Sequence, residues 1–234
     1  MTMQLRQFGF YMLAITAIMI GCTNGSSNAE APVTFGGGSQ RLPSKDVQDI
    51  VSYADQLSVF SVVSESEIQP PEEVFERGEG YIGRKVTIRI EQNLWNRGPI
   101  AEAKGDIELT VQGWTLHDNE RRLFSLAGAP RLEVGKRYVG PLVLLSGGRF
   151  GDGEWSVFAP WTTLRLEGDR TVRSEVVVGI TPEPVAVMLT GKSLGELAQL
   201  FGETQPDPFS LQYAELDPES RYILASQARR TSGE

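Results

Sequence analysis

Aromatic and charged residues gather around a glycine-rich stretch in the second half of the sequence. Arg149 and Phe150 precede Gly151, and Trp155 and Trp161 follow shortly after it. Flat rings beside Gly-rich loops are typical of sugar- and peptide-binding surfaces, because they supply contact area at low entropic cost. Arg149, Phe150, Trp155 and Trp161 are therefore a candidate binding surface. The alternative is that the two tryptophans fill the core or one end of a barrel.

The single histidine gives little support for catalysis or metal binding. A zinc site needs several His or Cys ligands, and a Ser-His-Asp apparatus needs a histidine held by a buried carboxylate. His117 is followed by Asp118-Asn119-Glu120, which is typical of a hairpin tip, so we expect an exposed turn histidine. Carboxylates are abundant, but a hydrolytic pair could meet only in the fold. From the sequence we assign no catalytic residues, no metal site and no cofactor.

Two glycine motifs match nucleotide-binding loops only in part. The segment from Gly78 to Gly83 has the spacing G-x-G-x-x-G, which binds dinucleotides only between a strand and a helix. Here Pro-Pro-Glu-Glu precedes the motif and a strand-like segment follows, which predicts a loop entering a strand. Gly191-Lys192-Ser193 lacks the first glycine of a phosphate loop, because that position is Ala186. Ser193 is better explained as the N-cap of a helix.

Composition and charge restrict the class of protein. The chain has 234 residues, of which 40% are hydrophobic and 22% charged, as in an ordinary globular domain. The net charge of −8 repels phosphate backbones, so we expect no nucleic-acid partner. There is one cysteine, Cys22, so no intramolecular disulfide can form and the fold must rest on packing.

The N-terminal segment has the pattern of an export signal. Arg6 supplies a positive charge, and the uncharged, mostly apolar stretch from Phe8 to Ile20 follows it. A membrane-spanning helix needs about 20 apolar residues, so this shorter run is more typical of a signal-peptide core. The next residues, Met19-Ile20-Gly21-Cys22, resemble the lipobox of bacterial lipoprotein signal peptides, although Met19 replaces the usual Leu and Ile20 is bulkier than usual.

The lipobox resemblance implies cleavage after Gly21 and diacylglycerol attachment to the Cys22 thiol. Thr23 to Gly38 is rich in Asn, Gly, Ser and Ala and holds no apolar run, as a tether requires. Thr23 after the cysteine implies the outer membrane if the cell has two. We therefore expect a lipid anchor in the cell membrane or outer membrane, with the folded part facing the periplasm or exterior. The alternatives are plain secretion after cleavage before Glu30 and an uncleaved membrane anchor.

The rest of the sequence predicts mainly half-buried strands. Val47, Ile50, Val51 and Ala54 form one apolar stripe, which predicts a helix from an N-cap at Ser44. Further on, a capping box at Ser193–Glu196 and an Asp217-Pro218-Glu219 start predict two more helices. In between, alternating or apolar runs predict strands, with Pro141 indicating an edge or a bend. These runs are 57–63, 86–91, 107–112, 138–145, 155–158 and 163–167.

This order predicts a mainly β protein: a small antiparallel, OB-like β-barrel with short flanking helices. It resembles exported β-barrel domains of the OB-fold and netrin-module kind over residues 54–201. The stretches that carry this resemblance are Tyr53-Ala54-Asp55 before 57–63, 85–91, 132–137 before 138–145, and the Leu-rich helix 194–201. In netrin-type metalloproteinase inhibitors a free N-terminal Cys chelates metal. We do not transfer that activity, because Cys22 is expected to be lipidated and far from the barrel.

The predicted organisation is a signal peptide (1–21), a flexible tether (22–43), a β-barrel (44–192) and a C-terminal helical appendage with a tail (193–234). The preferred hypothesis is a non-enzymatic, membrane-tethered module of the cell envelope that binds an envelope protein, a peptide or a cell-wall glycan. An envelope hydrolase with carboxylate chemistry and a secreted inhibitor-like barrel remain as alternatives. A deep pocket with two close carboxylates would favour the hydrolase, and a shallow aromatic patch would favour the binding module.

Overall fold

The structure is a computed structural model that describes residues 33–36, 42–70, 72–98, 102–126, 128–145, 153–172 and 183–233. The chain divides into two units, Met1–Glu30 and Ala31–Glu234, and all described residues belong to the second. Cys22 and the predicted signal therefore lie outside the described residues, as do Arg149 and Phe150.

One sheet organises the described part of the chain. All its strand pairs are antiparallel except β1 with β5, and the hydrogen-bonded order is β1-β5-β4-β3-β2-β6-β8-β9, with β7 also paired to β6. The strands are β1 (Val33–Gly36), β2 (Gln56–Ile68), β3 (Gly80–Asn96), β4 (Asp106–His117), β5 (Glu120–Leu126), β6 (Arg137–Leu145), β7 (Glu154–Val157), β8 (Leu164–Glu167) and β9 (Arg170–Val172).

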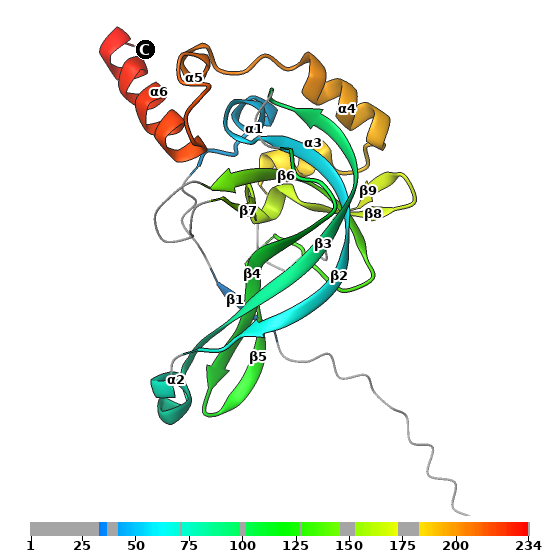
Figure 1. Ribbon diagram of the computed structural model, residues 1–234, viewed down its shortest axis with the longest axis vertical. Helices are drawn as coiled ribbons and strands as arrows, with labels where there is room; N and C mark the ends of the chain where they lie inside the picture. The colour runs from blue at the N-terminus through cyan, green and yellow to red at the C-terminus, as the bar shows by residue number, and fades with distance from the viewer. Residues whose placement is uncertain are drawn as a thin grey trace, which may run out of the picture. The chain divides into compact units, whose positions relative to one another are not determined.

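The sheet curls into a half-barrel (Figure 1). Its long central pair, β2 and β3, carries three register shifts, between Leu57 and Ser58, Val59 and Phe60, and Val62 and Ser64. Such bulges bend a strand and increase its twist, which allows two long strands to wrap around a core. The prediction of a mainly β, antiparallel barrel-like fold with short helices is confirmed.

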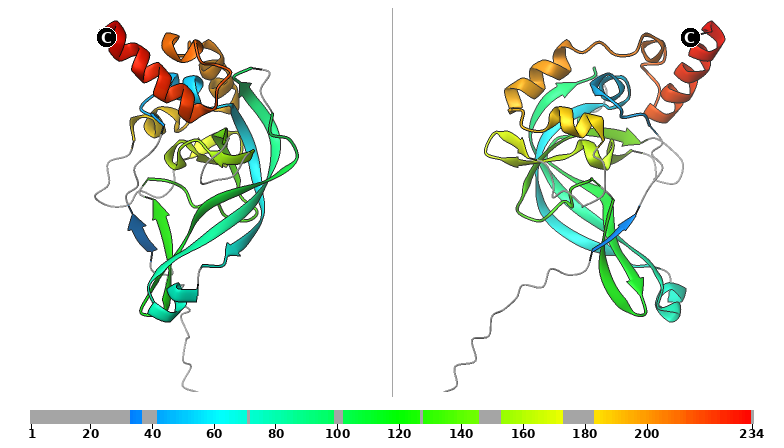
Figure 2. Two further views of the ribbon diagram at one scale, coloured as in Figure 1. Left: turned by 60° about the vertical axis from the view of Figure 1, so that its left-hand side comes forward. Right: turned by 180° about the vertical axis from the view of Figure 1, so that it is seen from behind.

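The helices gather at the two ends of the sheet. Figures 1 and 2 show α2 alone at one end, with the other helices grouped at the opposite end. The helices are α1 (Val47–Tyr53), α2 (Glu72–Arg77), the short 3-10 helix η2 (Pro160–Thr162), α3 (Pro184–Leu189), α4 (Leu194–Glu203), α5 (Pro208–Leu211) and α6 (Pro218–Ser232).

Two hydrophobic clusters hold this arrangement together. One lies inside the curl of the sheet, where the alternating residues of β3, Val86 and Ile88, are fully buried with Leu109 of β4. The other lies between the sheet and the helices, and it joins Ile50 of α1 to Phe201 of α4. The helical end is thus packed onto the sheet by apolar contacts, and this second cluster forms one wall of the pocket described below.

Local capping explains most helix boundaries. The capping box at Ser193 and Glu196 is present, with the Ser193 backbone N–H donating to the Glu196 carboxylate at 2.7 Å. Asp217 caps α6, as the sequence predicts. The prediction of Ser44 as the first N-cap is wrong by two residues, because Asp46 accepts the Asp49 N–H at 2.9 Å.

Pro141 lies where β6 changes partners. Tyr138 and Val139 pair with β8, whereas Leu142 to Leu145 pair with β7. A proline has no N–H to donate, so the gap between two partner strands accommodates it. On the other edge of β6, Pro141 lies opposite Leu57 of β2.

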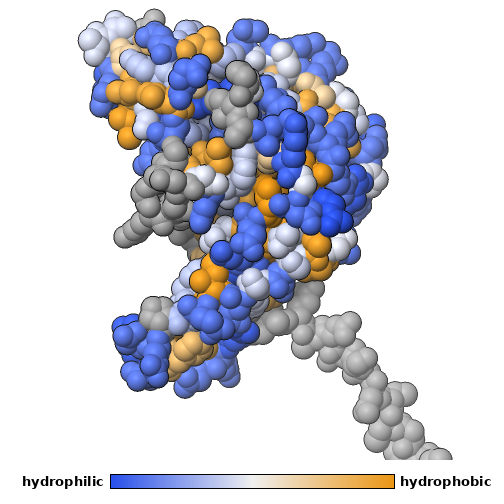
Figure 3. Space-filling view, viewed as in Figure 1, coloured by the Kyte–Doolittle hydropathy of each residue, from blue (hydrophilic) through white to orange (hydrophobic). Residues whose placement is uncertain are grey.

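The surface is largely hydrophilic in the space-filling view (Figure 3). Exposed large hydrophobic residues include Leu211, Leu216 and Ile223 in the C-terminal helical region. Within the described ranges, no helix combines the length and the apolar character needed to cross a bilayer.

Candidate functional site

A pocket of about 240 Å³ lies at the helical end of the sheet. Its lining includes buried Arg221 at the floor and buried Phe201 on one wall, whereas Gly202, Gln205 and Leu211 at its rim are exposed. A cavity with a buried floor and an exposed rim is the usual form of a small-molecule site. The lining residues come from α1, the end of β3, α4, α5 and α6: Val51, Ser52, Trp95, Arg97, Phe201, Gly202, Thr204, Gln205, Pro206, Ser210, Leu211, Ala214 and Arg221.

The wall residues face the pocket because of their spacing along the strand and the helix that carry them. Trp95 and Arg97 are two positions apart at the end of β3, so their side chains lie on the same face. The Trp95 ring packs against the Phe201 ring, with 5.9 Å between the ring centroids and 58° between the planes. This aromatic pair forms an apolar wall beside the charged floor.

Three charged residues, Asp55, Arg97 and Arg221, form a buried charge cluster beneath the pocket. The Arg97 Nη2 donates to Asp55 Oδ1 at 2.9 Å, and the Arg97 backbone N–H donates to the Asp55 carbonyl at 3.0 Å. Arg221 Nη2 lies 3.9 Å from the same Asp55 oxygen. The three side chains are only 3%, 10% and 1% exposed in the order Asp55, Arg97, Arg221. A charge cluster this buried is costly unless its groups are well paired.

The pairing in this cluster is incomplete. Arg97 also donates to the Ala214 carbonyl at 2.7 Å, and Arg221 donates to the carbonyls of Ser52 and Leu216. The Nε atoms of both arginines are nevertheless buried without a hydrogen-bond partner. Burial lowers the pKa of Arg221 to about 10, and repulsion from Arg97 adds to the shift. The cluster thus holds donor capacity that the protein does not use.

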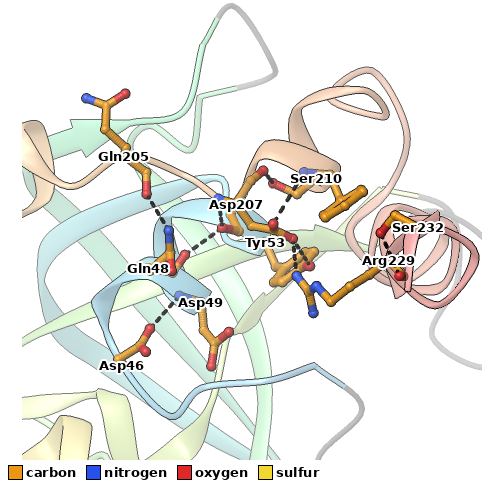
Figure 4. Close-up of polar contacts among 11 residues, drawn as sticks. Asp46, Gln48, Asp49, Tyr53, Gln205, Asp207, Ser210, Arg229 and Ser232 are labelled. Atoms are coloured by element: carbon orange, nitrogen blue, oxygen red, sulfur yellow. Dashed lines mark hydrogen bonds and ion pairs between the residues drawn. The ribbon is translucent and has the colours of Figure 1, made fainter. Parts of the chain in front are cut away.

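A second polar network, centred on Asp207, fixes the loop between α4 and α5. Figure 4 shows the Asp207 carboxylate between Tyr53 and Arg229. Arg229 Nη2 donates to Asp207 Oδ2 at 2.6 Å, and the Tyr53 hydroxyl donates to the same oxygen at 3.3 Å. The Asp207 backbone N–H donates to Ser52 Oγ, which links this loop to α1. Burial, followed by the charge of Asp207, raises the pKa of Tyr53 to about 12.

Comparison with known proteins gives no match. No family model, no curated protein and no solved structure is similar to this chain. The assignment of a site therefore rests on the geometry.

The predicted aromatic surface is described only in part. Trp155 packs against the cluster inside the sheet, and Trp161 packs against the cluster beneath the helices, where its indole Nε1 donates to Ser44 Oγ at 3.0 Å. The two rings thus contact different hydrophobic clusters. Arg149 and Phe150 are outside the described residues, so a binding surface of all four residues stays a prediction.

Trp155 also lines a smaller pocket of about 120 Å³. This pocket lies where the curl brings β7 toward β3 and β4, and its other lining residues are Lys85, Glu108, Thr110, Leu145, Glu154 and Ser156. The two carboxylates are exposed, and Glu108 pairs with Lys85 at 3.2 Å. This shallow, solvated site does not give the hydrolase alternative a specific supporting observation.

His117 occupies the hairpin position that the sequence predicts. It ends β4 before the turn residues Asp118 and Asn119, which both have positive φ angles, and its side chain is 55% exposed. Glu79 lies 3.7 Å from His117 Nδ1, while Asp118 lies 3.4 Å from Nε2. Because the carboxylates approach opposite nitrogens of an exposed ring, we do not treat the three residues as a metal site.

The charge cluster itself was missed by the sequence analysis. A usable signal exists in α6, where Pro218, Arg221 and Ala225 are the buried positions at helical spacing. An arginine in the core-facing stripe of a helix indicates a buried partner or a ligand. Asp55, between a helix stripe and a strand, is the matching signal at the other end of the chain.

Proposed function

We propose that this chain is a membrane-tethered binding module of a bacterial cell envelope, and that the pocket above the buried charge cluster is its ligand site. The observation that carries the proposal is the combination of an open rim with a lining that includes two largely buried arginines, both within 4 Å of one buried carboxylate beneath the pocket. An uncompensated buried charge costs several kcal/mol, so a protein rarely retains one without a partner. A ligand that enters the pocket would supply that partner.

The proposed tether is supported by the sequence alone. The lipobox-like segment ending at Cys22 fits a lipid anchor, and the small polar residues after it fit a flexible stretch. The predicted tether (22–43) is corrected at 33–36, because these residues form strand β1 and pair with β5. Such a tether would hold the folded part near the membrane while leaving it free to meet a ligand or a partner. One acyl chain gives only marginal membrane binding, whereas the two chains of a diacylglycerol group give a stable anchor.

A pair of glycine variants tests the ligand site. Gly195 and Gly202 both lie in α4, and a Cβ at either position meets no atom within 4 Å, but only Gly202 lines the pocket. We expect Gly202→Phe to abolish ligand-induced thermal stabilisation in a screen of small metabolites, and Gly195→Phe to leave it unchanged. If every hit stabilises both variants equally, the pocket is not the binding site.

Metabolic labelling tests the tether. Cells that express the full chain are grown with a fatty-acid analogue, and the label is compared between wild type and Cys22→Ser. We expect label on the wild-type protein only, together with release of the variant from the membrane fraction. An unmodified mature chain beginning at Glu30 would contradict the anchor and support plain secretion.

A second candidate site rests on Trp155 and its small pocket. The exposed Lys85 and Glu154 beside a half-buried indole could contact a peptide or a cell-wall glycan. Titration with soluble cell-wall fragments should then broaden the Trp155 indole signal in NMR spectra and leave that of Trp161 unchanged. Equal effects on both indoles would argue against a specific site.

A further inference from the structure

The residues that line the pocket above the buried charge cluster bear on the chemical class of its ligand. We infer that the pocket takes a small carboxylate that carries an apolar ring. This inference rests on the proposed function, because it assigns a chemical class to the same site. Three features carry it: the charge of the floor, the unused donors and the aromatic wall.

At the floor of the pocket, the positive groups in contact outnumber the negative ones. Two guanidinium groups, of Arg97 and Arg221, share one carboxylate, Asp55, within 4 Å. Asp217 also acts on Arg221 electrostatically, but it does so without contact, because its carboxylate is held by the N–H groups of the first turn of α6. Asp207, the remaining buried carboxylate of this region, is paired with Arg229. One further negative charge at Arg97 and Arg221 would therefore complete the pairing.

The donors favour a planar anion. A guanidinium group presents five N–H donors in a flat fork, which matches the two oxygens of a carboxylate. Arg97 and Arg221 each use both Nη atoms on protein oxygens, yet each keeps a buried Nε without a partner. Asp55 Oδ2 is already occupied by the Leu144 N–H at 2.8 Å, so it offers little further compensation. These Nε atoms have almost no accessible surface, so a carboxylate in the pocket would meet the arginines at the guanidinium atoms that line it and supply the negative charge that they share too little of.

The walls set the size and character of the rest of the ligand. Trp95 and Phe201 form a continuous aromatic side, and Val51 and Leu211 add aliphatic surface. The volume of about 240 Å³ is below that of most drug-sized sites, which begin at about 300 Å³. One aromatic ring or a short branched chain beside the carboxylate suits a cavity of this size.

The hydroxyl groups of the wall contribute acceptors rather than donors. Ser52, Thr204 and Ser210 donate to the carbonyl oxygens of Gln48, Leu200 and Asp207, respectively. Their hydrogens are therefore committed to the protein, and the arginines are the charged donors among the lining residues that an anion would meet. This places the anionic end of the ligand at the floor and its ring toward the aromatic wall.

Benzoate and benzamide are matched probes for this inference. They share one ring and one planar polar group, but only benzoate is charged. Binding is followed by calorimetry and by the indole ¹H–¹⁵N signal of Trp95, assigned from the spectrum of Trp95→Phe. We expect benzoate to bind at least about tenfold more tightly than benzamide and to shift the Trp95 signal. Acetate, which lacks the ring, should bind more weakly than benzoate.

The α4 glycine pair again controls for the location of binding. Gly202→Phe should abolish the benzoate response, and Gly195→Phe should retain it. Arg221→Gln removes a floor donor directly, but it also releases bonds to the carbonyls of Ser52 and Leu216, so its folding must be checked by circular dichroism. The glycine variants keep the inference testable even if that variant does not fold.

Each outcome has a distinct meaning. Equal affinities for benzoate and benzamide, both lost in Gly202→Phe, would overturn the carboxylate inference and leave the pocket as the ligand site. Benzoate binding no tighter than that of acetate would overturn the assignment of an apolar ring. Benzoate binding that persists in Gly202→Phe, or no binding at all, would overturn the inference for this pocket. The metabolite screen with the same variants decides the proposed function separately.

Discussion

Replacing Asp55 with Asn tests whether the buried charge cluster holds the helical end of the fold in place. The substitution preserves shape and removes one negative charge. In the native protein, Asp55 Oδ1 accepts from Arg97 and Oδ2 accepts from the Leu144 N–H. An amide has only one oxygen, so its NH₂ group must face one of these donors. The variant therefore loses a charge and leaves one buried donor unsatisfied.

The expected magnitude follows from the burial of the pair. Removing one partner of a buried ion pair costs about 3–5 kcal/mol, because the remaining charge is left uncompensated. The Asp55 side chain is 3% exposed, so solvent screens this loss very little. Since a domain is stable by only about 5–15 kcal/mol, the variant loses a large share of its free energy of unfolding. For a unit of this length, the melting temperature falls by roughly 10 °C.

Urea unfolding followed by far-UV circular dichroism measures this effect. We expect a lower midpoint with an unchanged m-value, which indicates lost stability without a change of the denatured state. Asp106→Asn is the matched control, because Asp106 also pairs with an arginine, Arg89, at 2.7 Å but on the open surface. A surface pair contributes little, so the control should change the midpoint far less. Equal midpoints for the two variants would refute the argument.

A double variant isolates the pair itself. Arg97→Gln alone leaves Asp55 without its closest cation, and the combination with Asp55→Asn removes both charges. We expect the loss in the double variant to be smaller than the sum of the two single losses, because both single variants lose the same Asp55–Arg97 interaction, which the double variant loses only once. Strict additivity would show that Asp55 and Arg97 act independently.

Three further predictions concern other parts of the unit. Gly113→Ala should destabilise by several kcal/mol in urea unfolding, because the added Cβ would lie 2.0 Å from the Ile82 carbonyl oxygen; a cost near zero would contradict this close approach. Between about pH 10 and pH 12, wild type should lose more stability than Tyr53→Phe, since the raised pKa of Tyr53 favours folding only while the hydroxyl is protonated, whereas the raised pKa of Tyr138 acts in both proteins; parallel pH profiles of the two proteins would refute it. Ser193→Ala should cost about 1 kcal/mol through loss of the capping box, and Ser193→Thr should recover most of it in thermal unfolding.

Local features of the fold could be predicted from the sequence because their causes are local. The stripe of Ile50, Val51 and Ala54 indicates α1, and the alternation of Val86 and Ile88 indicates a half-buried strand. The turn after His117 and the cap at Ser193 follow from side chains that bond to their own neighbourhood. In each case the residues that decide the structure lie within a few positions of one another.

The pocket could not be predicted because its residues are far apart in the sequence. Arg221 donates to the carbonyl of Ser52, 169 positions away, and no local pattern encodes that contact. The parallel pairing of β1 with β5 and the partner change along β6 are likewise properties of the tertiary arrangement. The aromatic binding surface was predicted from residue types alone. The fold places its two described tryptophans against different hydrophobic clusters.

The hydrogen bond from Arg221 to the Ser52 carbonyl also has a consequence for the kinetics of folding. Because α6 is synthesised long after α1, the cavity lacks Arg221 at its floor until translation has passed α6. A chain that lacks α6 would therefore expose Asp55 and Arg97 to water. Joining segments so distant is slow relative to local folding. Closure of this cavity is thus expected to be a late step in the folding of the unit.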